Sequence, residues 1–158
     1  MKNSTFYQIA IKPIDDETKK LEKFCATLDK DPVAKKNQLA EYKCAKYRYA
    51  SVAHIYNLLY HGNRVYQKPA IHIDIENSIE NNEELFNLCN NAGEDEKIDF
   101  KLYYGISFLL QEKIAEYSTR LIHASDWEKI ELEERIGGLQ FAKVCLDEAW
   151  QRRKDVIA

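Results

Sequence analysis

The segment "YKCAKYRYASVAHIYNLLYHGN", residues 42–63, carries the strongest indication of how this chain folds. Its apolar and aromatic residues recur at steps of three and four, which is the period of one helical face. The residues of that face are Tyr42, Ala45, Tyr49, Val52, Tyr56 and Leu59. A second stripe, on another side, comprises Tyr47, Ala50, His54, Leu58 and His61. Because a helix that is apolar on almost every side is surrounded by neighbours, the segment predicts a central helix over about 33–62.

Helices are also expected over most of the remaining sequence. Only five Gly and three Pro interrupt the 158 residues, and so few breakers favour long helices over many short strands. Further helices are predicted over about 15–28, around 85–89, over about 95–121 and over about 126–154. A chain of this length is about one domain. The sequence therefore predicts a mainly α, single-domain bundle (1–158) of about five helices around the central helix.

Two short segments indicate strands instead. "FYQIAIKP" (6–13) is a short apolar stretch that Pro13 stops. "AIHIDIE" (70–76) alternates between apolar and polar residues, as a half-buried strand does. A small two-stranded sheet, 6–13 with 70–76, is therefore an option beside the helices, although the sequence does not show whether the two segments pair.

The last predicted helix contains two local features. Ser125 and Glu128 match a capping box, in which a Ser at the cap is followed three residues later by Glu. Gly137 and Gly138 lie in the interior of the same helix, where each costs about 1 kcal/mol relative to Ala. This pair therefore indicates either a kink or a place where another backbone comes close.

Charge is distributed unevenly between the two halves of the chain. The net charge is −3, but residues 1–70 carry 13 Lys and Arg against 7 Asp and Glu, whereas residues 71–158 carry 10 against 19. The favoured interpretation is that a basic half and an acidic half pack against each other. The alternative is a basic face that binds nucleic acid, or an acidic face that binds a basic partner.

The sequence also limits where the protein acts. No window reaches the roughly 18 apolar residues of a membrane span, and the N-terminus has no secretory pattern. Cys25, Cys44, Cys89 and Cys145 are widely spaced without a CxxC motif, which indicates reduced thiols in a cytoplasmic protein. Since no phosphate-binding loop or zinc-finger spacing occurs either, no cofactor is expected.

Arg48 and His54 form the first candidate catalytic site. Their spacing resembles the Arg-x(4–6)-His signature of HEPN-type helical domains, many of which are RNA-cleaving toxins or defence proteins. The resemblance, which covers this one motif, implies that Arg48 steadies phosphate and that His54 does acid–base work, usually across a dimer interface. Tyr49 follows the Arg where the family often has a polar residue. Six residues of unbroken helix turn about 600°, so convergence of the two side chains requires a helix that begins between them or a second chain.

His72, Asp74 and Glu76 form a candidate metal site. The three side chains project from one face of the predicted 70–76 strand, and imidazole and carboxylate groups together can bind a cation. Same-face neighbours on a strand are about 7 Å apart, so three of them rarely converge on one ion. A solvated strand face is therefore the favoured interpretation.

Two charged surfaces are candidates for binding a partner. The basic stretch 35–48 presents Lys43, Lys46 and Tyr47, and cations interleaved with aromatic rings can bind RNA or single strands. The acidic stretch 126–135 presents Glu128, Glu131 and Glu134, which can face a basic partner. For each surface the alternative interpretation is a solvated helix face.

The absence of a recognisable catalytic motif favours a non-catalytic function. The sequence predicts an intracellular protein that binds a macromolecular partner, most simply another protein, in the manner of an inhibitor, antitoxin, immunity protein or adaptor. Ten Tyr residues support this, because Tyr suits wet interfaces. The alternative is a HEPN-like ribonuclease or RNA-binding protein that uses Arg48 and His54. A homodimer is compatible with either function.

Overall fold

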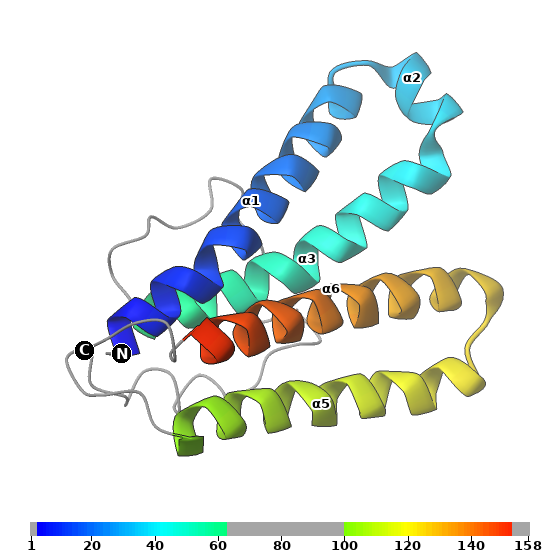
Figure 1. The fold of residues 1–158 in the computed structure, drawn as a ribbon. Coiled ribbons are helices and arrows are strands. Elements are labelled where there is room, and N and C mark those ends of the chain that lie inside the picture. Colours follow the sequence, from blue (N-terminus) through cyan, green and yellow to red (C-terminus); the bar gives the residue numbers. More distant parts are fainter. Residues whose placement is uncertain (1–2, 63–99, 153–158) are drawn as a thin grey trace.

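The described part of the chain, residues 3–62 and 100–152 of a computed structural model, consists of helices and short connections (Figure 1). The helices are α1 (Asn3–Asp29), α2 (Pro32–Asn37), α3 (Leu39–Gly62), α5 (Phe100–Ile122) and α6 (Asp126–Gln151). The mainly α fold that the sequence predicts is therefore confirmed. None of these helices is long and apolar enough to cross a membrane.

The strand predicted for 6–13 is wrong, because these residues belong to α1. Phe6, Ala10, Ile11 and Ile14 are fully buried in the main core, and their spacing matches one helical face. Pro13 lies inside this helix rather than at its end. Burial of the apolar stripe therefore outweighs the cost of a helical proline, which removes one backbone hydrogen bond. The predicted strand 70–76 lies outside the described residues, among which no strand occurs.

The segment predicted as one helix over 33–62 consists of α2 and α3. Asp31 caps α2, because its side chain accepts a hydrogen bond from the Ala34 N–H at 3.1 Å and Pro32 occupies the first turn. Gln38 leaves the helical conformation (φ −118°, ψ 33°), and its N–H still donates to the Ala34 carbonyl at 2.9 Å. α3 then begins at Leu39 and runs without a break to Gly62.

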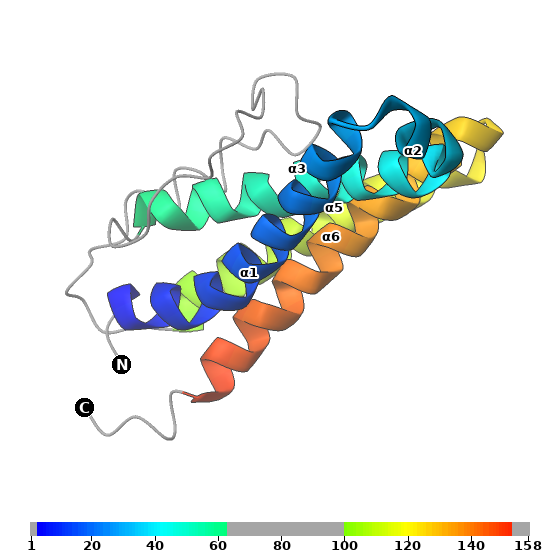
Figure 2. The ribbon, with the colours of Figure 1, turned by 90° about the horizontal axis from the view of Figure 1, so that it is seen from above.

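α3 and α6 share the centre of the bundle. α6 packs against α1, α3 and α5, whereas α3 packs against α1, α2 and α6. Figure 1 shows α6 between α3 and α5, and Figure 2 shows α1 running along α3 and α6. A helix of the basic N-terminal half, α3, therefore packs directly against a helix of the acidic C-terminal half, α6.

Gly137 and Gly138 mark a close approach rather than a kink, since α6 continues through both. A Cβ added at Gly138 would lie 2.9 Å from the Cβ and Oγ of Ser51 on α3. The Ser51 hydroxyl donates a hydrogen bond to the Arg135 carbonyl at 2.9 Å, which ties the two helices together at this point. The small residues allow the two backbones to pack closely.

Ser125 is the N-cap of α6, as the sequence predicts, but the capping box is incomplete. The Ser125 carbonyl accepts the Lys129 N–H at 2.9 Å, while the Ser125 side chain makes no capping hydrogen bond. Cys25, Cys44 and Cys145 are free thiols, and burial raises the pKa of Cys145 to about 12. Cys89 lies outside the described residues.

Candidate functional site

Arg48 points towards α6 and is paired there. Its Nη1 lies 3.9 Å from Oε2 of Glu134, and 3.1 Å from the position that a Cβ on Gly137 would occupy. His54 is six residues further along the same unbroken α3, and its side chain lies outside the described part of the structure. The HEPN-like pairing of Arg48 with His54 therefore stays a prediction. Meanwhile the Glu134 carboxylate partly neutralises the guanidinium that would have to bind phosphate.

Tyr47 and Glu131, two of the residues predicted to bind a partner, make contacts within the chain instead. Nε of the buried Arg135 donates to Oε1 of Glu131 at 3.2 Å, and its guanidinium lies 5.9 Å from the Tyr47 ring. Burial, followed by the charge of Glu131, raises the pKa of Tyr47. Tyr47, Glu131 and Arg135 therefore form part of the α3–α6 contact.

Of the remaining predicted partner-binding residues, Lys43, Lys46 and Glu128 are exposed. Lys46 lies over the ring of Tyr42 at 5.8 Å. Because Tyr47, Glu131 and Glu134 are used internally, each of the two charged surfaces offers fewer groups to a partner than the sequence suggests.

A polar cluster joins the ends of α1, α2 and α3. The Tyr42 hydroxyl donates to Oδ1 of Asp29 at 2.8 Å, and Nζ of Lys35 donates to the same oxygen at 3.1 Å. Lys35 also lies over the Tyr42 ring at 4.4 Å. The hydrogen bond from Tyr42, and then that from Lys35, lowers the pKa of Asp29. Tyr42 and Lys35 therefore connect helices, which makes them less available to RNA.

Tyr42→Phe is expected to raise the pKa of Asp29 towards its ordinary value of 3.8, because the strongest donor to the carboxylate is lost. A lowered pKa stabilises the fold above that value, and the contribution is lost as pH falls through the folded-state pKa. The variant should therefore be less stable than wild type at neutral pH, and the difference should become smaller in strong acid. An NMR titration of the Asp29 carboxyl carbon measures the pKa. Lys35→Met is the matched control and should raise it less; an unchanged pKa in Tyr42→Phe would contradict this account.

The candidate metal ligands His72, Asp74 and Glu76 lie outside the described residues. Within residues 3–62 and 100–152, no three His, Cys, Asp or Glu side chains are grouped so that they could hold a metal ion.

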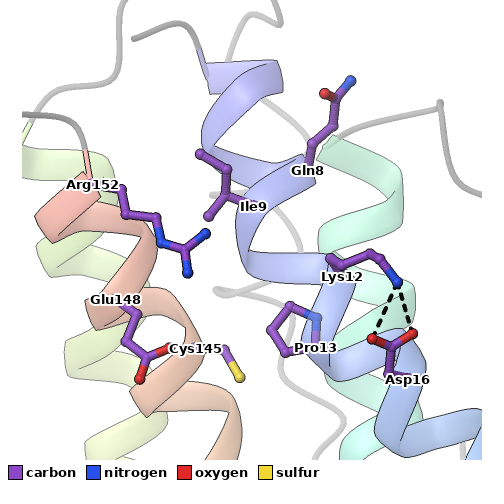
Figure 3. A pocket seen from close by; sticks show the side chains of 8 residues that line it. All are labelled: Gln8, Ile9, Lys12, Pro13, Asp16, Cys145, Glu148 and Arg152. Atoms are coloured by element: carbon purple, nitrogen blue, oxygen red, sulfur yellow. Dashed lines mark hydrogen bonds and ion pairs between the residues drawn. The ribbon is translucent and has the colours of Figure 1, made fainter. Parts of the chain in front are cut away.

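A groove of about 490 Å³ lies between α1 and α6 (Figure 3). Its lining includes Lys12, Pro13 and Asp16 from α1, Cys145 and Glu148 from α6, and Arg152 at the C-cap of α6. Figure 3 shows the Arg152 side chain reaching towards α1, while Lys12 pairs with Asp16 at 3.0 Å. The two cations and two carboxylates balance one another. Since burial raises the pKa of Cys145 to about 12, its thiol stays protonated at neutral pH and is a poor nucleophile.

The outward face of α5 is the most unusual surface of the described residues. Its inward face carries Leu102, Ile106, Leu109, Leu110, Ile114 and Tyr117, all buried. On the other side lies a row of exposed residues, here named the α5 stripe: Phe100, Tyr104, Phe108, Gln111, Ala115, Thr119 and Ile122. At 100° per residue, these positions fall within an arc of about 100°. The row itself contains no charged residue, although a solvated helix face is normally charged, and the exposed Lys101 lies at the edge of the same arc.

The large side chains of the α5 stripe are well exposed and mutually supported. Phe100, Tyr104, Phe108 and Ile122 are 57%, 53%, 49% and 74% exposed. The rings of Phe100 and Tyr104 stack with centroids 5.3 Å apart, and those of Tyr104 and Phe108 with centroids 6.0 Å apart. The ring of Trp150 on α6 also packs near Phe100, with the two ring centroids 6.1 Å apart. The large side chains of the stripe therefore form an apolar surface on α5, the helix that Figure 1 shows at one edge of the bundle.

Sequence reasoning missed the α5 stripe because it followed only the inward period of this helix. The sequence does carry a signal on the side opposite that inward period. Steps of four, four and three lead from Phe100 to Ile122, and no residue at these steps is charged. Comparisons of the chain with family models, with curated proteins and with solved structures found no match.

Proposed function

We propose that this chain is a non-catalytic binding protein whose docking surface for a protein partner is the α5 stripe. The observation that carries the proposal is the exposure of three stacked aromatic rings in a row of α5 residues that contains no charged side chain. Exposed apolar patches of this kind are characteristic of protein interfaces, where aromatic residues are enriched and charged residues are depleted at the centre. A solvated α5 would not need this composition.

The state of the other candidate groups also favours binding over catalysis. Arg48 is paired with Glu134, and the thiol of Cys145 has a high pKa. The free thiols of Cys25, Cys44 and Cys145 favour a reducing compartment, so we expect the partner in the cytoplasm. An inhibitor, antitoxin, immunity protein or adaptor would each act through such a surface.

Photo-crosslinking inside the cells that make the protein tests this proposal. A photoreactive phenylalanine analogue that replaces Tyr104 should give one discrete crosslinked product, which mass spectrometry identifies. The same analogue in place of Gln140, an exposed residue on α6, is the matched control and should give none. If the analogue at position 104 gives no discrete product, the α5 stripe is not a docking surface and the proposal fails.

Tyr104→Asp should weaken capture of that crosslinked partner at least 10-fold, because a carboxylate at the centre of an apolar interface must lose its water. Its effect on the free energy of unfolding should stay at about 1 kcal/mol, since Tyr104 is about half exposed and loses only its stacking on Phe100 and Phe108. Gln140→Asp adds the same charge on α6 and should leave capture unchanged. Equal capture by the two variants would contradict the assigned surface.

A further inference from the structure

The α5 stripe is complementary to itself when it is read in the opposite direction. Phe100 and Ile122 are each eleven residues from Gln111, so the row has its midpoint at Gln111. An antiparallel copy centred there places Phe100 opposite Ile122 and, within one residue of exact register, Tyr104 beside Thr119 and Phe108 beside Ala115. Two of these three pairs join an aromatic ring to a small side chain.

We propose that the α5 stripe binds a second copy of this chain, with the two α5 helices antiparallel across a two-fold axis at Gln111. The proposal rests on the proposed function, in which the stripe is a docking surface, and it names the partner. A two-fold interface must be self-complementary, and the order of large and small residues along the stripe meets that condition.

Packing favours the antiparallel over the parallel arrangement. A parallel pair would set three rings against three rings at one end and would set Ala115 and Thr119 against their own copies at the other. The rings would hold the helices apart at one end and leave a gap between the small residues at the other. A parallel pair is therefore disfavoured, because interfaces pack as densely as protein interiors. The antiparallel pair also aligns the two helix dipoles favourably.

The polar groups of the α5 stripe suit this arrangement. The Thr119 hydroxyl donates to the Ala115 carbonyl of its own helix at 3.0 Å, so it needs no partner from the other copy. Lys143 donates to Oε1 of Gln111 at 3.0 Å. An amide oxygen accepts two hydrogen bonds and the amide nitrogen donates two, so the two Gln111 side chains can pair across the axis without losing Lys143.

The exposed area indicates a weak dimer. Phe100, Tyr104, Phe108 and Ile122 are about half exposed or more, which leaves about 100 Å² for each side chain. Together they supply roughly half of the ~800 Å² that each partner contributes to an interface of standard size. The smaller residues of the stripe add to this, so we expect a dissociation constant of about 10 µM.

Glu112 supplies a signature that is specific to this geometry. It lies beside Gln111 on the flank of the α5 stripe, so the two-fold axis brings it near its own copy. Like charges that face each other weaken an interface. Glu112→Gln should therefore tighten the dimer two- to five-fold, an effect with no reason to occur if α5 faces solvent.

Sedimentation of the purified full chain between about 1 and 200 µM tests the dimer. Wild type should shift from monomer to dimer with a dissociation constant of about 10 µM, Tyr104→Asp should stay monomeric, and Gln140→Asp should behave as wild type. A wild-type protein that is monomeric at 200 µM overturns the inference. In that case a different protein crosslinked to position 104 in cells would leave the proposed function standing, whereas no crosslink would remove both.

Disulfide trapping tests the direction and register. Under oxidation, Gln111→Cys should form a covalent dimer, and Phe108→Cys should crosslink when it is mixed with Ala115→Cys but not alone. Wild type and Gln140→Cys are the controls and should remain uncrosslinked. A sedimenting dimer in which none of the stripe cysteines crosslinks would use another surface and would overturn the inference.

Discussion

Gly138→Val is expected to lower the free energy of unfolding by about 3 kcal/mol, the upper part of the range for overpacked cores. Even a single Cβ at this position lies 2.9 Å from the Ser51 side chain and 3.2 Å from Cγ2 of Val52. Ser51 and Val52 are fully buried, so neither side chain can move aside into solvent. The helices must separate, which also stretches the hydrogen bond from Ser51 to the Arg135 carbonyl. Urea unfolding should show the loss, with a melting temperature lower by roughly 10 °C.

Gly137→Ala is the matched control for this prediction. A Cβ at Gly137 meets only the guanidinium end of Arg48, at 3.1 Å, which can shift at little cost. The higher helix propensity of Ala should therefore leave stability unchanged or raise it by up to about 1 kcal/mol. In addition, Ser51→Gly should reduce the cost of Gly138→Ala, because it removes the atoms that clash. If substitutions at Gly137 and Gly138 lowered the free energy of unfolding equally, the contact with Ser51 would not determine the effect.

The α3–α6 contact shows how far the sequence leads. The Gly137–Gly138 pair indicates that something comes close to the last helix, and the apolar stripe through Tyr49 and Val52 indicates an interior helix. Neither pattern identifies Ser51 as the opposing residue, because 87 positions separate it from Gly138 in the sequence. A periodicity reports which face of a helix is buried and carries no information about which partner covers it.

The candidate site was harder to anticipate than the fold, for a different reason. Charged and aromatic residues such as Tyr47, Glu131 and Glu134 attract attention in a sequence, yet their partners in the structure are residues of the same chain. Tyr104 and Phe108 look like ordinary core residues until the burial of α5 shows that they lie on its outer side. Only the arrangement of helices decides which apolar positions are left over once the core is filled.

Pro13 caused the wrong strand prediction at 6–13. Read as a strand end, it cut a pattern that otherwise continues at helical steps through Phe6, Ala10, Ile14, Thr18, Leu21, Cys25 and Leu28. Thr18 is polar but fits this buried row, because its hydroxyl donates to the Ile14 carbonyl at 2.7 Å. The period over seven positions was stronger information than the single breaker, since tertiary burial sustains a helix that local propensity opposes.

Pro13→Ala is expected to stabilise the protein by about 2 kcal/mol. A proline inside a helix costs about 3 kcal/mol relative to alanine, because it removes one backbone N–H and crowds the carbonyl four residues earlier, here that of Ile9. Alanine restores the donor within α1, while the contacts of the ring with its half-buried surroundings are lost. Thermal unfolding should show a melting temperature higher by about 5 °C, without a change in helix content.

Pro13→Gly separates the restored hydrogen bond from helix propensity. Glycine also returns the N–H, but it disfavours a helix by about 1 kcal/mol relative to alanine, so this variant should fall between wild type and Pro13→Ala. If both variants are less stable than wild type, packing of the Pro13 ring beside Cys145 and Arg152 stabilises the protein by more than the missing backbone hydrogen bond costs. Pro13 would then be a packing residue of the α1–α6 contact, and the strength of the buried row alone would not explain why α1 continues through it.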